Sequence, residues 1–302
     1  MLQVLQNHEI DKTLWDNTIR ASGHNRPYAL SSYLDAVSPG WAAIIAADYT
    51  QVMPLPYHTK FGMRYVYQPA LCQQMGVYGT ETENSAQVAA FLEQAARFSP
   101  LIEIAVNSEN RIPGKKGLTI LRMQVNQSLS LQATYKDLQK KYSVSNKKNV
   151  IKAARSGSYI EQTHDASEVI AQIEHIYQPP EKRSRARACI AARALLDQRS
   201  LPAYSTYMAY NRTKKNIAGL LLFQFDHCLI PMTFSTVEGR KCAAVFALLD
   251  HIIEKYAQRD TTLNFLGSAV PGIQYRNAGF GAVSEQYPFI SMRRLPVTLF
   301  KA

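Results

Sequence analysis

The sequence predicts an α/β protein of the mixed α+β kind, with two similar units that follow one another along the chain. The main observation is an order of elements that occurs once in each half: three strands, a glycine-containing loop, a helix and a strand. A repeat at this distance indicates a duplicated domain, because a solenoid repeats every ~20–50 residues. A strand meander followed by a helix is also common without duplication. The composition agrees with globular domains, since 46% of the 302 residues are hydrophobic.

Periodicity and turn residues give the elements of the first half. Leu14, Thr18 and Ile19 lie at helical spacing behind Asp11, a residue suited to capping a helix N-terminus. The other elements follow in chain order: a short helix at 29–38, strands at 41–48, 50–58 and 64–69, a loop at 74–79, a helix at 85–98, and strands at 101–106 and 118–126.

The second half repeats this order. We expect strands at 203–211, 216–225 and 228–236, a glycine-containing loop at 237–241, a helix at 242–257 and a strand at 262–267.

The region between the two copies is basic and has helical periodicity. Residues 135–157 lack proline and end at a glycine, so they are expected to form one helix. One narrow sector of this helix carries the cationic side chains Lys141, Lys148, Lys152 and Arg155. The pattern predicts a helix that packs on one side and presents a cationic stripe on the other, and a solvated helix face explains the stripe equally simply.

A second basic helix is expected at 181–198. Its apolar residues are expected to dock against the protein: Ile190, Ala194 and Leu195. Its arginines are expected to face outwards or to surround a cleft: Arg183, Arg185, Arg187 and Arg193.

Charge and cysteine usage narrow the class of protein. The net charge is +11, which favours anionic partners. The cysteines lie far apart and the histidines are isolated, so the sequence predicts neither a metal site nor a disulfide framework. The first residues do not read as a signal peptide, and no apolar run approaches the ~18 residues of a membrane span. We expect a cytoplasmic protein without a transmembrane segment.

Three stretches together resemble the FemABX-like proteins, which are tandem GNAT-fold acyltransferases related to the aminoacyltransferases that form peptidoglycan bridges. They are the N-terminal pattern from Trp15 to Gly79, the basic segment 135–157, and residues 263–290 (LNFLGSAVPGIQYRNAGFGAVSEQYPFI). In the basic segment, Lys148 stands where the family motif has arginine. No sustained heptad pattern is present, so the chain resembles the shorter members that lack a coiled-coil arm.

This resemblance implies two GNAT-like domains, each a mixed, mostly antiparallel sheet flanked by helices. The first would comprise residues 1–133, completed by 291–302, and the second would comprise residues 134–290. It also implies transfer of an acyl or aminoacyl group from an activated donor to an amine. The acceptor would be an anionic small molecule or cell-wall precursor, bound in the interdomain cleft. The donor is either acyl-CoA or aminoacyl-tRNA, used as a co-substrate, and no tightly bound cofactor or DNA partner is implied.

GNAT domains bind the donor pyrophosphate at a glycine-containing loop that leads into a helix N-terminus, where free amides and the helix dipole favour anions. The matching segment here contains Gly239, Arg240 and Lys241, which become the candidate donor-phosphate residues. It meets the family pattern only in part, because Thr236 replaces the leading Gln or Arg and Lys241 replaces a small residue.

Candidate substrate residues come from two clusters. Lys148, Lys152 and Arg155 are the candidates for anion binding, and Arg276 joins them from the C-terminal motif. The polar tips of Ser268 and Tyr275 make them the catalytic candidates. Two other functions stay open: a non-catalytic GNAT-fold protein that binds an anionic ligand, and a nonspecific RNA binder. The latter is disfavoured because aromatic residues are not interleaved with the basic ones.

Overall fold

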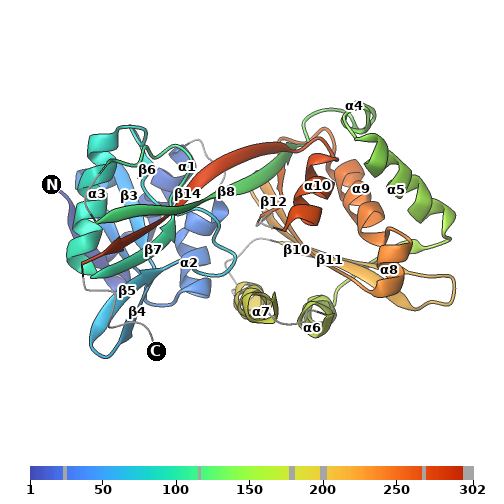
Figure 1. Ribbon diagram of the computed structural model, residues 1–302, viewed down its shortest axis with the longest axis horizontal. Helices are drawn as coiled ribbons and strands as arrows, with labels where there is room; N and C mark the ends of the chain where they lie inside the picture. Colours follow the sequence, from blue (N-terminus) through green and yellow to red (C-terminus); the bar gives the residue numbers. More distant parts are fainter. Residues whose placement is uncertain (23–25, 115–116, 177–180, 198–202, 267–269, 295–302) are drawn as a thin grey trace. The chain divides into compact units, whose positions relative to one another are not determined.

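A computed structural model describes residues 1–22, 26–114, 117–176, 181–197, 203–266 and 270–294 (Figure 1). The chain forms two compact units. Unit 1 comprises residues 1–124 and 286–302, and unit 2 comprises residues 125–285. The sequence analysis placed the boundaries after residues 133 and 290, whereas these units divide after residues 124 and 285. The chain passes between the units inside two long strands, β8 (Leu118–Ser130) and β14 (Val283–Arg293).

Unit 1 contains two sets of hydrogen-bonded strands. The first set runs in the order β1 (Gln3–Gln6), β2 (Ala42–Ile45), β3 (Gln51–Leu55) and β6 (Tyr78–Gly79). The second set runs in the order β4 (Tyr57–Lys60), β5 (Met63–Tyr67), β7 (Leu101–Ala105) and β14. The helices are α1 (Lys12–Ala21), α2 (Ser31–Val37) and α3 (Ser85–Phe98), with short 3₁₀ turns at Asn7–Glu9, Pro27–Ala29 and Ala47–Tyr49.

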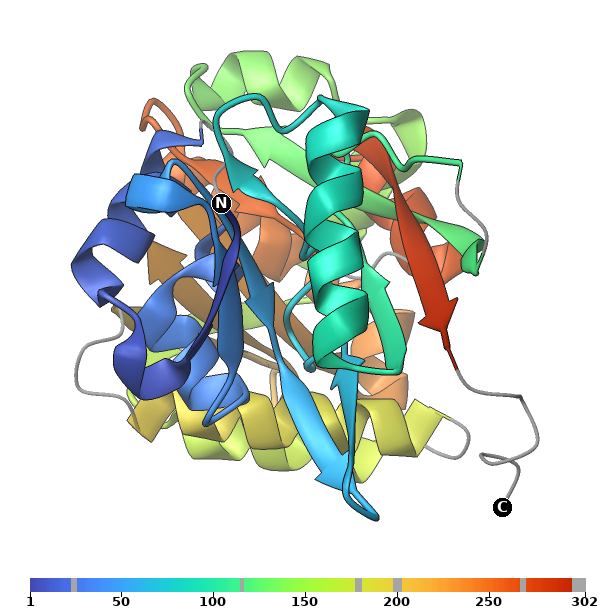
Figure 2. The same cartoon turned by 90° about the vertical axis from the view of Figure 1, so that its left-hand side faces the viewer.

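Local sequence signals explain where the helices of unit 1 begin. The side chain of Asp11 accepts hydrogen bonds from the first-turn amides of α1, and Asn84 does the same for α3. Figure 2 shows α3 lying along the strands of this unit. Residues 291–293 of β14 pair with β7, so the C-terminal strand adds to unit 1. The expected packing of residues 295–302 lies outside the described residues.

Unit 2 is built on the strand order β8, β13 (Thr262–Asn264), β12 (Cys228–Ser235), β11 (Asn216–Phe225), β10 (Tyr204–Tyr210) and β9 (Tyr159–Thr163). Its helices are α4 (Tyr135–Lys140), α5 (Val144–Arg155), α6 (Ala166–Ile176), α7 (Glu181–Asp197), α8 (Val237–Lys241), α9 (Ala244–Tyr256) and α10 (Pro271–Ala278). Figure 1 shows α9 on one side of β10–β12, and α6 with α7 on the other.

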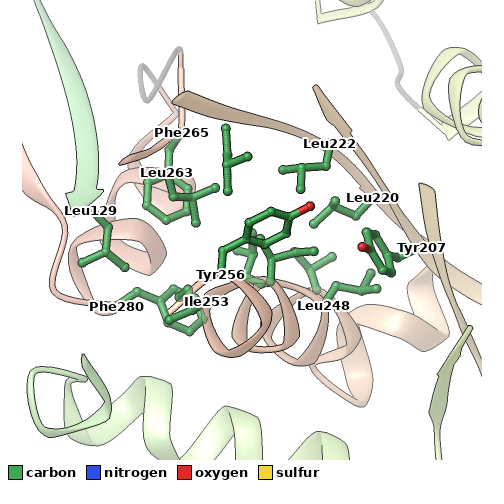
Figure 3. Close-up of a cluster of buried hydrophobic side chains, with 14 of the residues drawn as sticks. Leu129, Tyr207, Leu220, Leu222, Leu248, Ile253, Tyr256, Leu263, Phe265 and Phe280 are labelled. Atoms are coloured by element: carbon green, nitrogen blue, oxygen red, sulfur yellow. The ribbon is translucent and has the colours of Figure 1, made fainter. Parts of the chain in front are cut away.

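The main core of unit 2 lies between α9 and the sheet. Leu248 and Ile253 of α9 are fully buried against Leu220 of β11 and Leu263 of β13 (Figure 3). Phe280, which follows α10, enters the same cluster and is also fully buried. Burial of side chains of this size contributes roughly 1.5–3 kcal/mol each. The core therefore fixes the end of α10 beside α9.

Each unit contains one described parallel strand pair, joined by a connection that includes a helix. In unit 1, β5 pairs with β7 across α3. In unit 2, β12 pairs with β13 across α8 and α9, through Cys228–Thr262 and Leu229–Leu263. The pairs described within the two units are otherwise antiparallel. The expected mixed, mostly antiparallel sheets flanked by helices are thus present.

Three expected elements differ in the structure. Residues 50–58, expected as one strand, form the two strands β3 and β4, which belong to different sets. Residues 135–157 form two helices, because the chain breaks at Lys141–Ser143, and Lys141 therefore does not continue the cationic stripe of α5. Residues 237–241 form the short helix α8 instead of a loop.

The docking face of α7 was also predicted wrongly in part. Ile190 is 65% exposed, whereas Leu195 is buried as expected. The guanidinium of Arg193 pairs with the carboxylate of Glu174 on α6. The structure does not describe the side chains of Arg183 and Arg185.

Candidate functional site

A groove of about 680 Å³ lies on unit 2 and is lined by residues of α5 and α8 and of the positions that follow them. Its lining residues come from two segments far apart in the sequence: Lys148, Ile151, Lys152, Arg155, Ser156, Glu238, Lys241 and Cys242. Lys148, Lys152, Arg155 and Lys241 are cationic, and Glu238 is the acidic member. The structure thus brings the expected anion-binding residues together with one residue of the expected phosphate loop.

The cationic side chains of the groove are exposed and are not neutralised by acids. Within the part of the chain that the structure describes, no ion pair involves Lys148, Lys152, Arg155 or Lys241. Lys152 and Arg155 lie in the last turn of α5, where positive charge also compensates the helix dipole. An anion in the groove would meet several unpaired cations at once, and Arg155 offers the planar fork that suits phosphate or carboxylate.

The start of α5 is fixed by contacts with a distant part of the chain. Ser143 caps the helix by accepting a hydrogen bond from the amide of Asn146, at 3.1 Å. The amide of Ser143 donates to the carbonyl of Gly279, at 2.8 Å. The buried side chain of Asn146 donates to the carbonyl of Arg276, at 2.9 Å. Lys148 and the later groove residues are therefore held on a helix whose origin is locked to α10.

A buried carboxylate also fixes the approach to α5. Asp250 of α9 accepts hydrogen bonds from the hydroxyls of Tyr135 and Tyr142, both at 2.9 Å. Burial raises the pKa of Asp250, and burial beside Asp250 raises the pKa of both tyrosines. This network ties α4 and the break before α5 to the helix that forms the core.

The position of α8, which forms the other wall of the groove, is fixed by contacts of Thr236 and Gly239. The hydroxyl oxygen of Thr236 accepts a hydrogen bond from the Gly239 amide and donates to the carbonyl of Ile217, both at 3.0 Å. A Cβ on Gly239 would come within 2.1 Å of that same carbonyl oxygen. Gly239 is buried, with its amide used by the cap. It therefore lets α8 pack on β11 and is not placed to hold a phosphate.

The two remaining candidates of the α8 segment, Arg240 and Lys241, differ in whether they line the groove. Arg240 is not among the residues that line the groove, and its guanidinium donates to the carbonyl of Ser235, at 2.9 Å. Lys241 lines the groove. Glu238 and Cys242, which the sequence analysis did not select, line it too. These three positions share a helix face at spacings of three and four residues, so a helical reading of this segment would have grouped them.

Two polar groups of the groove are held by local contacts. Asn211, in the turn between β10 and β11, donates to Glu238 Oε1 at 2.6 Å. The thiol of Cys242 donates to the carbonyl of Glu238, at 2.9 Å. Cys242 is half-buried, whereas the other cysteines are buried. Burial raises the pKa of Cys228 to about 12, so that thiol stays protonated at neutral pH.

The C-terminal candidates lie apart from this lining. Tyr275 on α10 is 67% exposed, and the guanidinium of Arg276 donates to the side chain of Asn277. Neither lines the groove described above. Ser268 lies outside the described residues. Among the described residues, no cluster of histidine, cysteine, aspartate or glutamate is suited to hold a metal ion.

Searches of protein-family models and of curated proteins return no match for this chain. Solved structures do match it over nearly its whole length. FemX aligns with a TM-score of 0.62 at 10% identity, over 95% of this chain and 96% of FemX. A tandem GNAT protein from the clavulanic acid biosynthesis pathway aligns with a TM-score of 0.56 at 10% identity, over 96% and 98%.

A third structure, L-PGS from Bacillus licheniformis, aligns with a TM-score of 0.50 at 9% identity, over 96% of this chain and 94% of that one. The chain therefore has the FemABX-like tandem GNAT fold, as the sequence motifs indicated. Identities this low establish the fold alone. No helix among the described residues has the length and apolar character needed to cross a membrane.

Proposed function

We propose that this protein is an acyltransferase, and that the groove of unit 2 binds the anionic part of one substrate during transfer of an acyl or aminoacyl group to an amine. The observation that carries the proposal is the convergence of Lys148, Lys152, Arg155 and Lys241, from two separate helices, on one groove. The tandem GNAT fold supports the reaction class, since two neighbours that share it are FemX and a tandem GNAT protein.

Acyl transfer requires little covalent chemistry from the protein, because the donor is already activated. The amine nitrogen attacks the carbonyl carbon of the activated donor, the bond to the leaving thiol or hydroxyl breaks, and a base takes the proton from nitrogen. The protein must place the two reactants, accept that proton and stabilise the oxyanion that forms in between. The groove offers cations for the charged parts of a substrate and one carboxylate, Glu238, for a proton or an ammonium group.

The test is equilibrium binding of labelled acetyl-CoA and of a mixed pool of aminoacylated tRNA across a range of salt concentrations. We compare the native protein with Lys148→Glu/Lys152→Glu. Lys136→Glu/Lys147→Glu is the matched control, because it makes the same charge change on α4 and α5 outside the groove lining. We expect saturable binding of one donor, weakened at least about tenfold in the groove variant and much less in the control.

A second candidate function is a non-catalytic protein that binds an anionic ligand. The use of the Gly239 amide by Thr236 favours it, because a free amide at this point is what a pyrophosphate would need. Product analysis by mass spectrometry distinguishes the acyltransferase from the non-catalytic binding protein. The donor that binds is incubated with primary amines, including a nucleotide-linked cell-wall precursor, and the products are analysed. An acylated amine that the native protein forms and the groove variant does not supports the enzyme. Binding without transfer supports the second candidate.

A further inference from the structure

The β4–β5 hairpin of unit 1 has an unusual residue at its tip. Lys60 pairs with Met63, so Phe61 and Gly62 form a two-residue turn. Both have positive φ, +52° for Phe61 and +75° for Gly62, which is the type I′ pattern. Asn-Gly is the pair that suits such a turn. A bulky residue in the left-handed region is strained.

Packing within the chain does not offset this strain. Phe61 is 87% exposed, the largest exposed fraction of any described hydrophobic side chain after Met1. The ammonium of Lys60 lies 5.3 Å from the centre of the Phe61 ring. A cation–π contact at such an exposed site is weak. The phenyl ring therefore adds little to the stability of unit 1. Contacts within the described part of the chain therefore do not account for a phenylalanine at this position.

The surroundings of Phe61 are cationic. No acidic residue occurs between Asp48 and Glu81 in the sequence, whereas Lys60 and Arg64 flank the turn and are exposed. The guanidinium of Arg64 lies 4.7 Å from the ring centre of Phe98, which holds it at the base of the hairpin. Figure 2 shows the hairpin extending beyond the other strands of unit 1. The hairpin thus combines one exposed aromatic ring with the positive charge of Lys60 at its tip and of Arg64 nearer its base.

We propose that the β4–β5 hairpin docks on membrane surfaces that contain anionic lipid, with Phe61 inserted at the boundary of the headgroups and acyl chains. An aromatic ring favours that depth, and each nearby cation is attracted by anionic headgroups. A two-residue turn is too small for the roughly 800 Å² that one side of a stable protein interface needs. Insertion of a single ring into a bilayer does not need an interface of this area. The docking is independent of the function proposed for unit 2.

The test is co-sedimentation of the purified protein with vesicles of phosphatidylcholine alone and with phosphatidylglycerol added. We expect binding to the anionic vesicles only. Phe61→Asn should weaken it about fivefold to tenfold, since the ring no longer enters the bilayer. Phe61→Asn creates the preferred Asn-Gly turn, so its Tm should equal or exceed that of the native protein. Val283→Thr, at another exposed apolar side chain, should bind like the native protein.

Phe61→Trp gives an independent readout. The native tryptophans, Trp15 and Trp41, are fully buried, so they should not respond to lipid. Emission from the new tryptophan should shift to shorter wavelength with anionic vesicles and be quenched by brominated lipid. The proposal is overturned if the native protein does not bind these vesicles in dilute salt, or if Phe61→Asn binds them equally well. A lipid-independent dimer or RNA complex that Phe61→Asn abolishes would also overturn it.

Discussion

Replacing Gly239 by alanine tests whether this glycine serves packing or ligand binding. The added Cβ would lie 2.1 Å from the carbonyl oxygen of Ile217 and 2.7 Å from Ser235 Oγ, where ordinary contact begins near 3.4 Å. Because the closest atom belongs to the backbone of β11, α8 must move away by more than an ångström. That shift would also disturb the cap that Thr236 makes with the Gly239 amide.

The expected loss of stability can be estimated from these contacts. Overpacking against backbone costs roughly 1–3 kcal/mol, and weakening the cap costs about 1 kcal/mol more. The better helix propensity of alanine returns up to about 1 kcal/mol. The net loss is about 2 kcal/mol, which lowers the Tm of a unit of this size by about 4–8 °C.

The assay is thermal unfolding followed by circular dichroism. Gly272→Ala is the matched control, because Gly272 lies in helix α10 with no atom within 4 Å of an added Cβ. The control should unfold at the native temperature or slightly above. An unchanged Tm for Gly239→Ala, with weaker donor binding, would refute the packing role and restore Gly239 as a phosphate ligand.

Three further predictions concern the elements that hold the groove. Tyr142→Phe leaves the buried Asp250 Oδ1 without its donor and should lower the free energy of unfolding by about 1–3 kcal/mol in urea titrations; the same change at the exposed Tyr275 should have almost no effect. Because burial raises the folded-state pKa of Asp250, its contribution to stability is complete below the unfolded pKa of about 3.9 and is lost as the pH rises through the folded pKa. Asp250→Asn should therefore show a flatter decline of the unfolding free energy above pH 4, and an unchanged slope would contradict this. Thr236→Ala removes the cap of α8 and should lower the unfolding free energy by about 1 kcal/mol, whereas Thr236→Ser should retain most of it.

Elements with local end signals could be predicted closely from the sequence. The helix expected at 85–98 has those bounds in the structure, because Asn84 caps its start. The strand expected at 216–225 also has its expected bounds, since turn residues flank a continuous apolar run. In both segments the local sequence pattern agrees with the burial of the side chains. The sequence did not predict β1 or the division of residues 50–58 into β3 and β4.

Elements fixed by distant contacts could not be predicted in the same way. The break before α5 combines a local signal, the Ser143 cap, with a hydrogen bond from the Ser143 amide to the Gly279 carbonyl, which no local pattern reveals. The edge strand β9 is mostly exposed on both faces and shows no clear alternation, so it was missed. Cys189, Ala192 and Leu195 are among the buried residues of α7, whereas Ile190 faces solvent.

The candidate site likewise combines residues that local patterns predict with residues that distant contacts bring together. Helical spacing grouped Lys148, Lys152 and Arg155 correctly on one face of α5. The sequence did not show that Lys241 lies beside them, because that contact depends on how α8 packs on β11. Glu238 was missed because residues 237–241 were read as a loop, and Cys242 was missed because it was read as the first residue of the following helix. If the segment is treated as a helix, the spacing of Glu238 and Cys242 predicts that they lie on the same face as Lys241.

If the groove between α5 and α8 binds the anionic part of the donor, a bound donor should shield Cys242, which lines this groove. The most direct measurement is the rate at which a small maleimide alkylates Cys242, with and without a saturating concentration of the donor that binds. The other cysteines are buried, so Cys242 is expected to dominate the reaction. We expect the donor to slow alkylation in the native protein and in Lys136→Glu/Lys147→Glu, but not in Lys148→Glu/Lys152→Glu. If a donor binds with full affinity while Cys242 reacts at its free rate, the donor site lies elsewhere and the groove is not the site.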